Sequence, residues 1–269
     1  MKESAKYKKD VLVTGASSGI GKAIALSLAE EGWNVYAASR NICEDVRTVG
    51  KGRITGIRMD VTDEESVRKA AEKIDDLSVI IHSAGFGIAS PAECADLDLV
   101  KKQFDTNYFG VLSVNSVFLE KLRKHKRSIV IAVSSFASSV PLPFQSHYSS
   151  SKYALKAYME ALRIEASPFG VQSVLVEPGD TRTSFTSSRI ESNIENTVYE
   201  KNARRAIDRM KNDEMNGKSP ESVARCVSRI LKRRNPPVRV TVGIEYKILM
   251  FLVKILPERM ILYILGRMY

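Results

Sequence analysis

Cysteine is scarce in this chain of 269 residues, which contains only Cys43, Cys94 and Cys226. Three thiols that lie far apart in the sequence cannot pair completely, and their spacing is not that of a zinc site. The sequence therefore excludes a disulfide scaffold and indicates a reducing compartment. We expect a cytoplasmic protein.

Long apolar runs are also missing. The runs Ile248–Val253 and Met260–Leu265 are far shorter than the roughly 20 residues that cross a bilayer. The basic segment Met1–Asp10 is followed only by the short run Val11–Val13, so we expect no signal peptide. With 44% hydrophobic and 27% charged residues, the chain is neither disordered nor fully embedded in a membrane.

Acidic residues are outnumbered, because 41 Lys and Arg against 31 Asp and Glu give a formal net charge of +10. A nucleic acid, an anionic membrane surface, a phosphorylated ligand or simple solubility would each account for this charge. No basic stripe interleaved with stacking aromatics is present, so we expect no nucleic-acid partner. The other three explanations stay open at this point.

Short apolar runs alternate with amphipathic segments along most of the chain. The expected strands are Val11–Thr14, Val35–Ala38, Ile54–Met59, Leu77–Ile81, Ile129–Val133 and Val171–Val176. The expected helices are Ile20–Glu31, a segment opened by a capping box of Thr62 and Glu65, Leu97–Lys124 and Ser146–Ser167. This alternation predicts an α/β fold with a doubly wound parallel sheet of the Rossmann type, in a single domain.

The pattern changes after Pro178. Residues 181–218 are polar and charged, which favours a lid inserted into the main domain of residues 1–243. A helix from Pro220 to about Arg233 and a strand at Val238–Val242 complete that domain. Residues 244–269 form an apolar and basic tail. Two interpretations of the tail stay open: an anchor at a membrane surface, or a cap on the substrate pocket or on a partner subunit.

The first expected strand runs into a glycine-rich turn, Thr14–Gly21, that directly precedes a helix. Glycines let the backbone approach a pyrophosphate, which the amino end of the helix attracts through its free N–H groups. This strand–turn–helix context predicts a dinucleotide-binding site.

A tyrosine and a lysine four residues apart, Tyr148 and Lys152, fall on one face of the helix expected at 146–167. Ser135 follows the strand Ile129–Val133, at the sheet edge where open parallel sheets bind ligands. Taken alone, the pair also fits an amphipathic helix with an incidental tyrosine and lysine.

Together these motifs resemble the classical short-chain dehydrogenase/reductase family, over about Asp10 to Thr183. The resemblance implies a catalytic set, which is Asn107, Ser135, Tyr148 and Lys152. The cofactor contacts that it implies, besides Tyr148 and Lys152, are Gly15, Ser17, Ser18, Gly19, Ile20, Gly21, Asp60, Val61, Ser83, Ala84, Gly85, Pro178, Gly179, Thr181 and Thr183. One departure is His82–Ser83, which stands where the family has two asparagines, and we expect a looser turn there.

The implied roles agree with elementary chemistry. A free phenol has a pKa of about 10, and we expect Lys152 and a nicotinamide cation to lower the pKa of Tyr148. Tyr148 would then exchange a proton with the substrate oxygen. Ser135 would hydrogen-bond the same oxygen, and Asn107 would hold a water in the proton relay. No metal is required, and we expect no catalytic role for His82 or His147.

The cofactor preference follows from the end of the second expected strand, Ala37–Arg40. NAD sites usually carry a carboxylate at this point, whereas Ser39 and Arg40 offer a hydroxyl and a guanidinium that suit a phosphate. We therefore expect NADP(H), with Arg40 as a cofactor contact and NAD(H) as the alternative.

The substrate pocket is expected to be apolar. Phe86–Gly87 and Val140–Phe144 would border it, which favours a bulky hydrophobic carbonyl or alcohol such as a steroid, a retinoid or an acyl-chain compound. A non-catalytic protein that senses a dinucleotide on the same fold is the alternative function.

Three further segments indicate which branch of the family the chain resembles. Phe109–Gly110, Pro141–Phe144 and Pro168–Gly170 are similar to those of the 17β-hydroxysteroid and retinol dehydrogenase-like branch, which includes fungal acyl-dihydroxyacetone-phosphate reductases. The family also implies a homodimer or tetramer, paired through the helices near 100–124 and 146–167.

Overall fold

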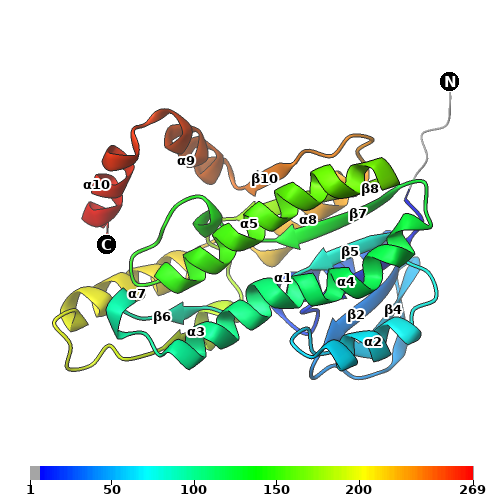
Figure 1. Cartoon of the computed structure of the whole chain (residues 1–269), viewed down its shortest axis with the longest axis horizontal. Helices are drawn as coiled ribbons and strands as arrows, with labels where there is room; N and C mark the ends of the chain where they lie inside the picture. Colours follow the sequence, from blue (N-terminus) through cyan, green and yellow to red (C-terminus); the bar gives the residue numbers. More distant parts are fainter. Residues whose placement is uncertain (1–6, 269) are drawn as a thin grey trace.

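Eight strands of the chain form one sheet in the computed structural model, which describes residues 7–268. Their order is β10–β8–β7–β5–β1–β2–β4–β3, and each neighbouring pair is parallel except β3 with β4. The strands are β1 Asp10–Thr14, β2 Asn34–Ser39, β3 Val46–Val49, β4 Gly52–Arg58, β5 Val79–His82, β7 Ser128–Val133, β8 Val171–Pro178 and β10 Arg239–Val242. The strand order changes direction between β1 and β5, which confirms the predicted doubly wound sheet. Figure 1 shows helices packed along this sheet.

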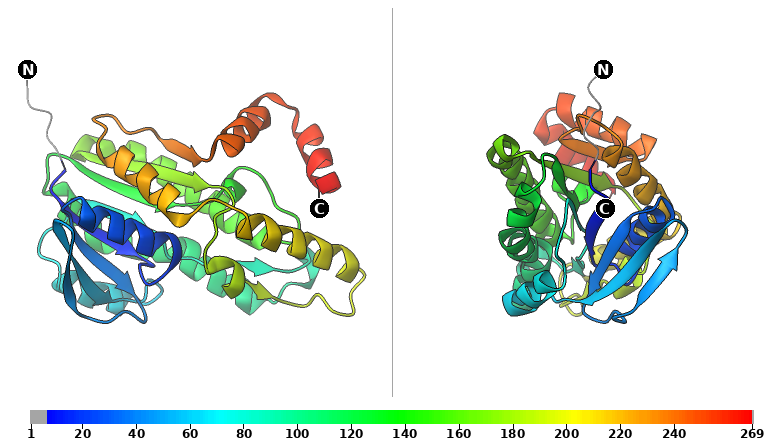
Figure 2. Two further views of the ribbon diagram at one scale, coloured as in Figure 1. Left: turned by 180° about the vertical axis from the view of Figure 1, so that it is seen from behind. Right: turned by 90° about the vertical axis from the view of Figure 1, so that its right-hand side faces the viewer.

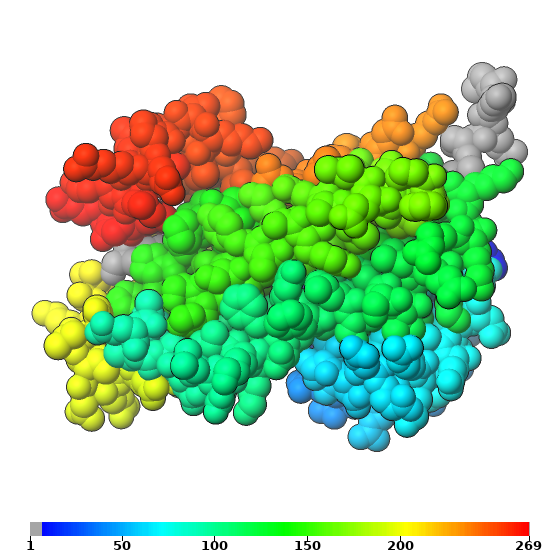
Figure 3. All heavy atoms as spheres, in the orientation of Figure 1, coloured from blue at the N-terminus to red at the C-terminus, as the bar shows by residue number. Residues whose placement is uncertain are grey.

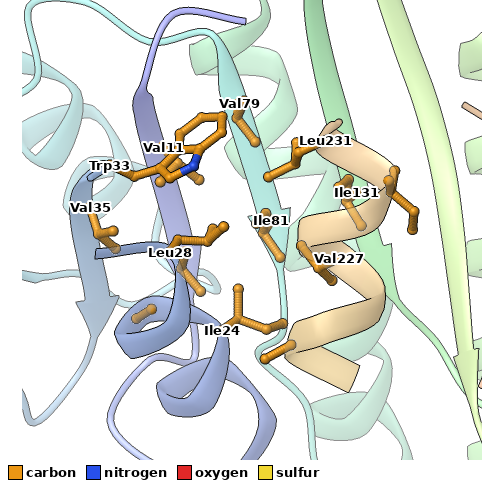
Figure 4. Close-up of a cluster of buried hydrophobic side chains, with 14 of the residues drawn as sticks. Val11, Ile24, Leu28, Trp33, Val35, Val79, Ile81, Ile131, Val227 and Leu231 are labelled. Atoms are coloured by element: carbon orange, nitrogen blue, oxygen red, sulfur yellow. The ribbon is translucent and has the colours of Figure 1, made fainter. Parts of the chain in front are cut away.

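Helices α1 (Gly19–Glu30) and α8 (Pro220–Leu231) cover one face of the sheet. Figure 4 shows Ile24 and Leu28 of α1 and Val227 of α8 lying over the central strands, and all three side chains are buried. Apolar residues three or four positions apart give each helix the stripe that this contact requires.

Helices α2 (Glu64–Glu72), α4 (Gly110–Arg123) and α5 (Ser146–Ala166) cover the other face, as the right-hand view of Figure 2 shows. Phe118 of α4 and Leu155 and Met159 of α5 are buried against the sheet. Because Leu155 and Met159 continue the face that carries Tyr148 and Lys152, packing of α5 holds this pair at the carboxyl ends of the strands.

Two local predictions are wrong near the sheet edge. Strand β3 was not expected, because Val46–Val49 is mostly exposed and includes Arg47 and Thr48, so no apolar run marks it. The predicted capping box is also wrong: the carboxylate of Asp63 caps α2 and accepts hydrogen bonds from the backbone N–H groups of the next turn. Thr62 instead donates its hydroxyl to Asp60 at 2.8 Å.

The helix predicted over residues 97–124 is not continuous. It consists of α3 (Leu97–Phe104), a π-helical turn η2 (Asp105–Phe109) and α4. A π turn takes an extra residue into the helix and is frequent at functional sites. Asn107 lies in the middle of this turn.

The predicted lid, residues 181–218, is folded and attached to the main domain. It contains α6 (Phe185–Ser188), β9 (Ile190–Glu191) and α7 (Glu200–Met215), and β9 pairs with β6 (Ile88–Ala89) in a second small sheet. Buried residues of α7, among them Ile207, pack with Ala89.

Two helices form the tail, α9 (Ile244–Ile255) and α10 (Glu258–Met268). They lie at the same end of the molecule as the lid, as the red and yellow segments of Figure 3 show. Met250 and Leu265 are buried with Phe136 and Val140 of the main domain. No helix within residues 7–268 is long and apolar enough to span a membrane.

Candidate active site

A cavity of about 1190 Å³ lies at the carboxyl ends of the strands, between the glycine turn, the lid and the tail. Pockets for one drug-sized ligand usually hold roughly 300–1,000 Å³, so this cavity has room for a dinucleotide and a second molecule. Every residue predicted to contact the cofactor lines it, together with Ser135. Asn107 does not line it.

The glycine turn has the close contacts that a dinucleotide site requires. Gly15 has a φ of +65°, and a Cβ there would lie 2.7 Å from the backbone nitrogen of Ala84. A Cβ on Gly21 would lie 2.3 Å from the carbonyl oxygen of Gly15. Ser18 precedes α1 without capping it through its side chain, so the first N–H groups of α1 stay available to an anion. This backbone fits a bound pyrophosphate.

Thr14 is a site residue that the sequence analysis did not single out. Its hydroxyl accepts hydrogen bonds from the backbone N–H groups of Ser83 at 3.1 Å and Ala84 at 3.3 Å. The side chain thereby joins the glycine turn to the loop that follows β5. Its position as the first residue of the glycine-rich turn Thr14–Gly21 was the signal in the sequence.

His82 stands at the position where the family has an asparagine, and it is buried. Its Nε2 lies 3.0 Å from Oδ1 of Asn115, whose Nδ2 donates to the hydroxyl of Tyr158 at 3.1 Å. Burial lowers the pKa of His82 to about 4, so the ring is neutral near pH 7. The expected looser turn is not found, because these contacts and Thr14 fix the segment.

Ser135, Tyr148 and Lys152 meet inside the cavity. Ser135 follows β7 and accepts a hydrogen bond from the N–H of Ala137 at 3.1 Å. Nζ of Lys152 donates to the carbonyl oxygen of Val133 at 3.3 Å and lies 5.7 Å from the centre of the Tyr148 ring. The structure thus brings together three of the four residues of the predicted catalytic set.

The pKa of Tyr148 is raised in the protein without cofactor. Burial raises it to about 12, although a hydrogen bond with Ser135 acts in the opposite direction. Burial also lowers the pKa of Lys152 to about 8. In the protein without cofactor, desolvation of the phenolate outweighs the effect of nearby groups. The lowering of this pKa by Lys152 together with a nicotinamide cation stays a prediction.

Asn107 lies behind the cavity rather than in it. Its Oδ1 accepts from the N–H of Phe86 at 3.0 Å, and its Nδ2 donates to the Phe86 carbonyl at 3.0 Å and to the Ser151 hydroxyl at 3.1 Å. Because both amide hydrogens have protein partners, the side chain is not free to donate to a water. It fixes the Gly85–Phe86 loop, and its part in a proton relay stays a prediction.

One end of the cavity fits the adenosine half of a dinucleotide. Arg40 is exposed there and makes no ion pair or hydrogen bond with another side chain of residues 7–268. The Ser39 hydroxyl beside it is buried and also has no partner within those residues. Oδ1 of Asp60 accepts from the N–H of Thr62 at 3.0 Å. A ligand phosphate would satisfy the groups on Ser39 and Arg40.

The other end carries the Pro178–Gly179 turn after β8. Thr181 donates to the Gly179 carbonyl at 2.9 Å, and Thr183 accepts from the N–H of Phe185 at 3.2 Å. A Cβ on Gly19 would lie 3.4 Å from Cβ of Thr183, so the lid begins directly against the glycine turn. These contacts place Thr181 and Thr183 beside the predicted cofactor groove.

Two aromatic residues, one of the lid and one of the tail, reach this end, and neither was expected there from the sequence. The Phe185 ring lies 5.7 Å from the Tyr148 ring. The Tyr246 ring of α9 lies 5.6 Å from the Phe136 ring, and its hydroxyl is hydrogen-bonded to Asp180. No spacing in the sequence signals these contacts, because they depend on how the lid and the tail fold back.

A sequence profile of the family described as short chain dehydrogenase matches residues 9–193. The chain therefore belongs to the short-chain dehydrogenase family, as predicted.

Three curated proteins illustrate which members of the family this chain is similar to. A 3-ketodihydrosphingosine reductase from Bacteroides thetaiotaomicron is 36% identical over 96% of this chain and 97% of its own length. An NADPH-dependent 1-acyldihydroxyacetone phosphate reductase from Schizosaccharomyces pombe is 37% identical over 72% of this chain and 67% of its own length. The estradiol 17-beta-dehydrogenase 2 of Mus musculus is 31% identical over 86% of this chain and 62% of its own length. The similarity thus extends to the branch named from the sequence.

Solved structures agree with the fold. A short-chain dehydrogenase from Streptomyces avermitilis has a TM-score of 0.77 at 26% identity, over 94% of this chain and 96% of that chain. Structures of similar fold have been solved with NADP and with NAD.

Proposed function

We propose that this protein is an NADP(H)-dependent oxidoreductase that interconverts a ketone and an alcohol on a long-chain hydrophobic substrate. The observation that carries the proposal is the apolar roof of the cavity. The tail side chains that form this roof are Leu249, Leu252, Val253, Leu256, Ile261, Ile264 and Leu265. An acyl chain gains free energy by leaving water against such a wall, whereas a sugar or a small polyol does not.

The residues below this roof would perform the reduction. When bound, NADPH supplies the hydride that adds to the carbonyl carbon. Tyr148 donates its proton to the carbonyl oxygen, and Ser135 donates a hydrogen bond to the same oxygen. Because burial raises the pKa of Tyr148 to about 12, the phenol holds its proton near pH 7 until the substrate oxygen takes it. Lys152 supplies a positive charge that stabilises the phenolate left behind.

Two observations support the choice of NADP(H) as cofactor and of a substrate that carries an acyl chain. The unpartnered hydroxyl of Ser39 and the exposed guanidinium of Arg40 suit the additional phosphate of NADP(H). The name of the Schizosaccharomyces pombe relative specifies NADPH and an acyl substrate, and the name of the Bacteroides relative specifies reduction of a 3-keto group. These names favour the reduction of a ketone on a substrate that carries a long acyl or alkyl chain.

A chain-length series tests this function. We expect kcat/KM with NADPH to rise at least about 100-fold from a short 3-keto compound of about six carbons to one of about sixteen, because each buried methylene contributes about 0.8 kcal/mol. Oxidation of NADPH, followed by absorbance, measures the rate, and NADH serves as the cofactor control. Equal kcat/KM values for the short and the long ketone would contradict the proposal.

We further propose that the tail lies on an anionic membrane surface. Besides its inner face, α9 carries an exposed apolar stripe at helical spacing, which is Ile244, Ile248, Phe251 and Ile255. A helix that is apolar all round is normally buried, and Lys247 and Lys254 flank this stripe. Apolar residues beside cations are typical of helices that lie at a lipid interface.

Flotation with vesicles tests the membrane proposal. The double variant Ile248→Glu/Phe251→Glu changes two exposed residues that do not line the cavity. We expect it to lose at least half of the flotation that the wild type shows with anionic vesicles, because two new carboxylates oppose both the apolar and the electrostatic attraction. Val46→Glu/Val198→Glu, at two exposed apolar positions outside the tail and the cavity, is the matched control and should float like the wild type. Unchanged flotation of the double variant would refute the membrane contact.

Assembly into a homodimer or tetramer through α4 and α5 stays a prediction. Tyr153 and Ile164 of α5 are exposed and apolar enough to take part in such a contact.

A further inference from the structure

A carboxylate is buried against the loop that carries Ser135. Glu177 is the next-to-last residue of β8, directly before the Pro178–Gly179 turn, and only 1% of its surface is exposed. It stands opposite Thr241 of β10 in the register of the sheet, and Oγ1 of Thr241 lies 3.5 Å from its Oε2. Glu177 does not line the cavity. Any effect that it has on the reaction must therefore pass through the groups that contact its carboxylate.

Two serines of this loop contact the carboxylate. Ser135 is the N-cap of the 3₁₀ turn η3 (Phe136–Ser138). The Ser138 hydroxyl is fully buried and lies 2.9 Å from Oε1 of Glu177 and 2.8 Å from the carbonyl oxygen of Ser135. Ser139 donates its hydroxyl to the same Oε1 at 3.4 Å. The carboxylate thus holds the far end of the short turn that Ser135 begins.

The same hydrogen bonds reach the helix that carries Tyr148. Nζ of Lys156 donates to the Ser139 hydroxyl at 3.1 Å. Lys156 lies on α5, one turn after Lys152 and two turns after Tyr148. The chain of contacts from Lys156 through Ser139 to Glu177 therefore connects α5, the loop after β7 and the end of β8.

The charge of Glu177 has a partner on the neighbouring strand. Nη1 of Arg239 on β10 lies 3.9 Å from Oε1 of Glu177, and its Nε lies 3.3 Å from Oε1 of Glu160 on α5. Burial of a carboxylate is tolerated where the group is paired and hydrogen-bonded. A buried polar network whose members are satisfied makes the surrounding structure rigid. We therefore expect the loop after β7 to be held firmly relative to α5.

We propose that Glu177 is a positioning residue, which holds the Ser135 hydroxyl where it and the Tyr148 phenol can bind the same substrate oxygen. Ser135 hydrogen-bonds Tyr148 but lies on a different element, so helical periodicity does not fix the distance between them. The two serines bind the loop to the carboxylate, and Lys156 binds it to α5. A displacement of about 1 Å at a reacting group can lower a rate by about 100-fold. This inference rests on the proposed reduction of a ketone and adds a residue from outside the cavity.

Two substitutions of Glu177 test the positioning. Glu177→Val removes both oxygens, and we expect it to lower kcat for a long-chain ketone about 10–100-fold. The Kd of NADPH should change less than about threefold. Glu177→Gln keeps an amide oxygen that can accept from Ser138, so its kcat should stay within about threefold of the wild type. Oxidation of NADPH, followed by absorbance, measures kcat.

Ser173→Ala is the matched control for lost packing between β8 and α5. Ser173 lies four residues before Glu177 on β8 and is also buried, and its hydroxyl donates to the carbonyl oxygen of Met159 on α5 at 2.8 Å. Its loss removes a buried hydrogen bond between the same two elements without touching the loop of Ser135. We expect a lower Tm and the kcat of the wild type.

The Ser135→Ala background separates positioning from a purely structural role. If Glu177 acts through the Ser135 hydroxyl, adding Glu177→Val to Ser135→Ala should lower kcat less than about twofold further, because no hydroxyl is left to place. A structural role independent of this hydroxyl would lower kcat by the same factor in both backgrounds. Thermal unfolding shows which variants are folded at the assay temperature. Ser138→Ala is a smaller change that breaks the same contact, and it replaces Glu177→Val if that variant does not fold.

The outcomes separate this inference from the proposed function. Wild-type kcat in a folded Glu177→Val or Ser138→Ala variant would overturn the positioning role, and so would equal losses in the two backgrounds. In either case the proposed function stands, because the wild type still reduces the ketone. If the wild type reduces no long-chain ketone, the proposed function fails and this inference fails with it.

Discussion

Tyr148→Phe is expected to lower kcat for ketone reduction by at least about 1,000-fold, within the range of about 10²–10⁴ that a general acid contributes. The substitution removes the phenolic hydroxyl, which carries the transferred proton, and keeps the ring that packs against Phe185. NADPH should therefore bind as it does to the wild type. Steady-state oxidation of NADPH measures kcat, and a fluorescence titration measures the Kd of the cofactor.

Tyr153→Phe is the control for this experiment. Tyr153 lies on the same helix, is 40% exposed and does not line the cavity, so its loss should leave kcat unchanged. Wild-type turnover by Tyr148→Phe would show that the phenol supplies no proton. If neither the wild type nor the variant reduces any ketone while both bind NADPH, the alternative of a dinucleotide sensor would be favoured.

Arg40→Asp is expected to raise the Kd of NADPH about 100-fold and that of NADH less than about threefold, because a charge-assisted hydrogen bond contributes about 1.5–3 kcal/mol. The new carboxylate repels the phosphate of NADPH and can accept the ribose hydroxyls of NADH. The ratio of the two Kd values, measured by titration, reports the change in preference.

Arg47→Asp makes the same change of charge on the exposed edge strand β3, away from the cavity. It should leave the Kd ratio of the two cofactors as in the wild type. Equal losses of NADPH and NADH affinity in Arg40→Asp would contradict the assignment of Arg40 to the phosphate and would leave the preference for NADP(H) without a basis in this residue.

The sheet and the groove could be predicted from the sequence because their signals are local. Buried parallel strands appear as apolar runs, and the turn Thr14–Gly21 contains glycines where a side chain would collide with neighbouring backbone. Tyr148 and Lys152 are four residues apart on one helix, so their shared face follows from helical periodicity alone. Ser135 joins them because it follows the end of β7 at the same edge of the sheet.

The features that could not be predicted from the sequence depend mostly on contacts between segments that lie far apart along the chain. Arg189 and Glu214 are 25 positions apart, and only the fold of the lid pairs them. Tyr246 reaches Asp180 because the tail turns back toward the strand ends. The pKa of Tyr148 depends on how completely the phenol is buried, which the spacing of two residues does not report. Strand β3 lacks an apolar run, because it lies at the edge of the sheet.

The π turn at Asp105–Phe109 adds one residue to an otherwise α-helical segment, which rotates α3 relative to α4 by about 100°. Gln103 on one side of this offset and Asn107 within it both donate to the carbonyl oxygen of Phe86, at 3.2 Å and 3.0 Å. The π turn therefore sets how α3 is rotated relative to α4, in addition to supplying one of the side chains that bind the Phe86 carbonyl. Removal of one residue from this turn would make the helix regular and would displace the side chains that hydrogen-bond the Phe86 loop beside Lys152. The number of residues in this turn is therefore as important to the site as Asn107 itself.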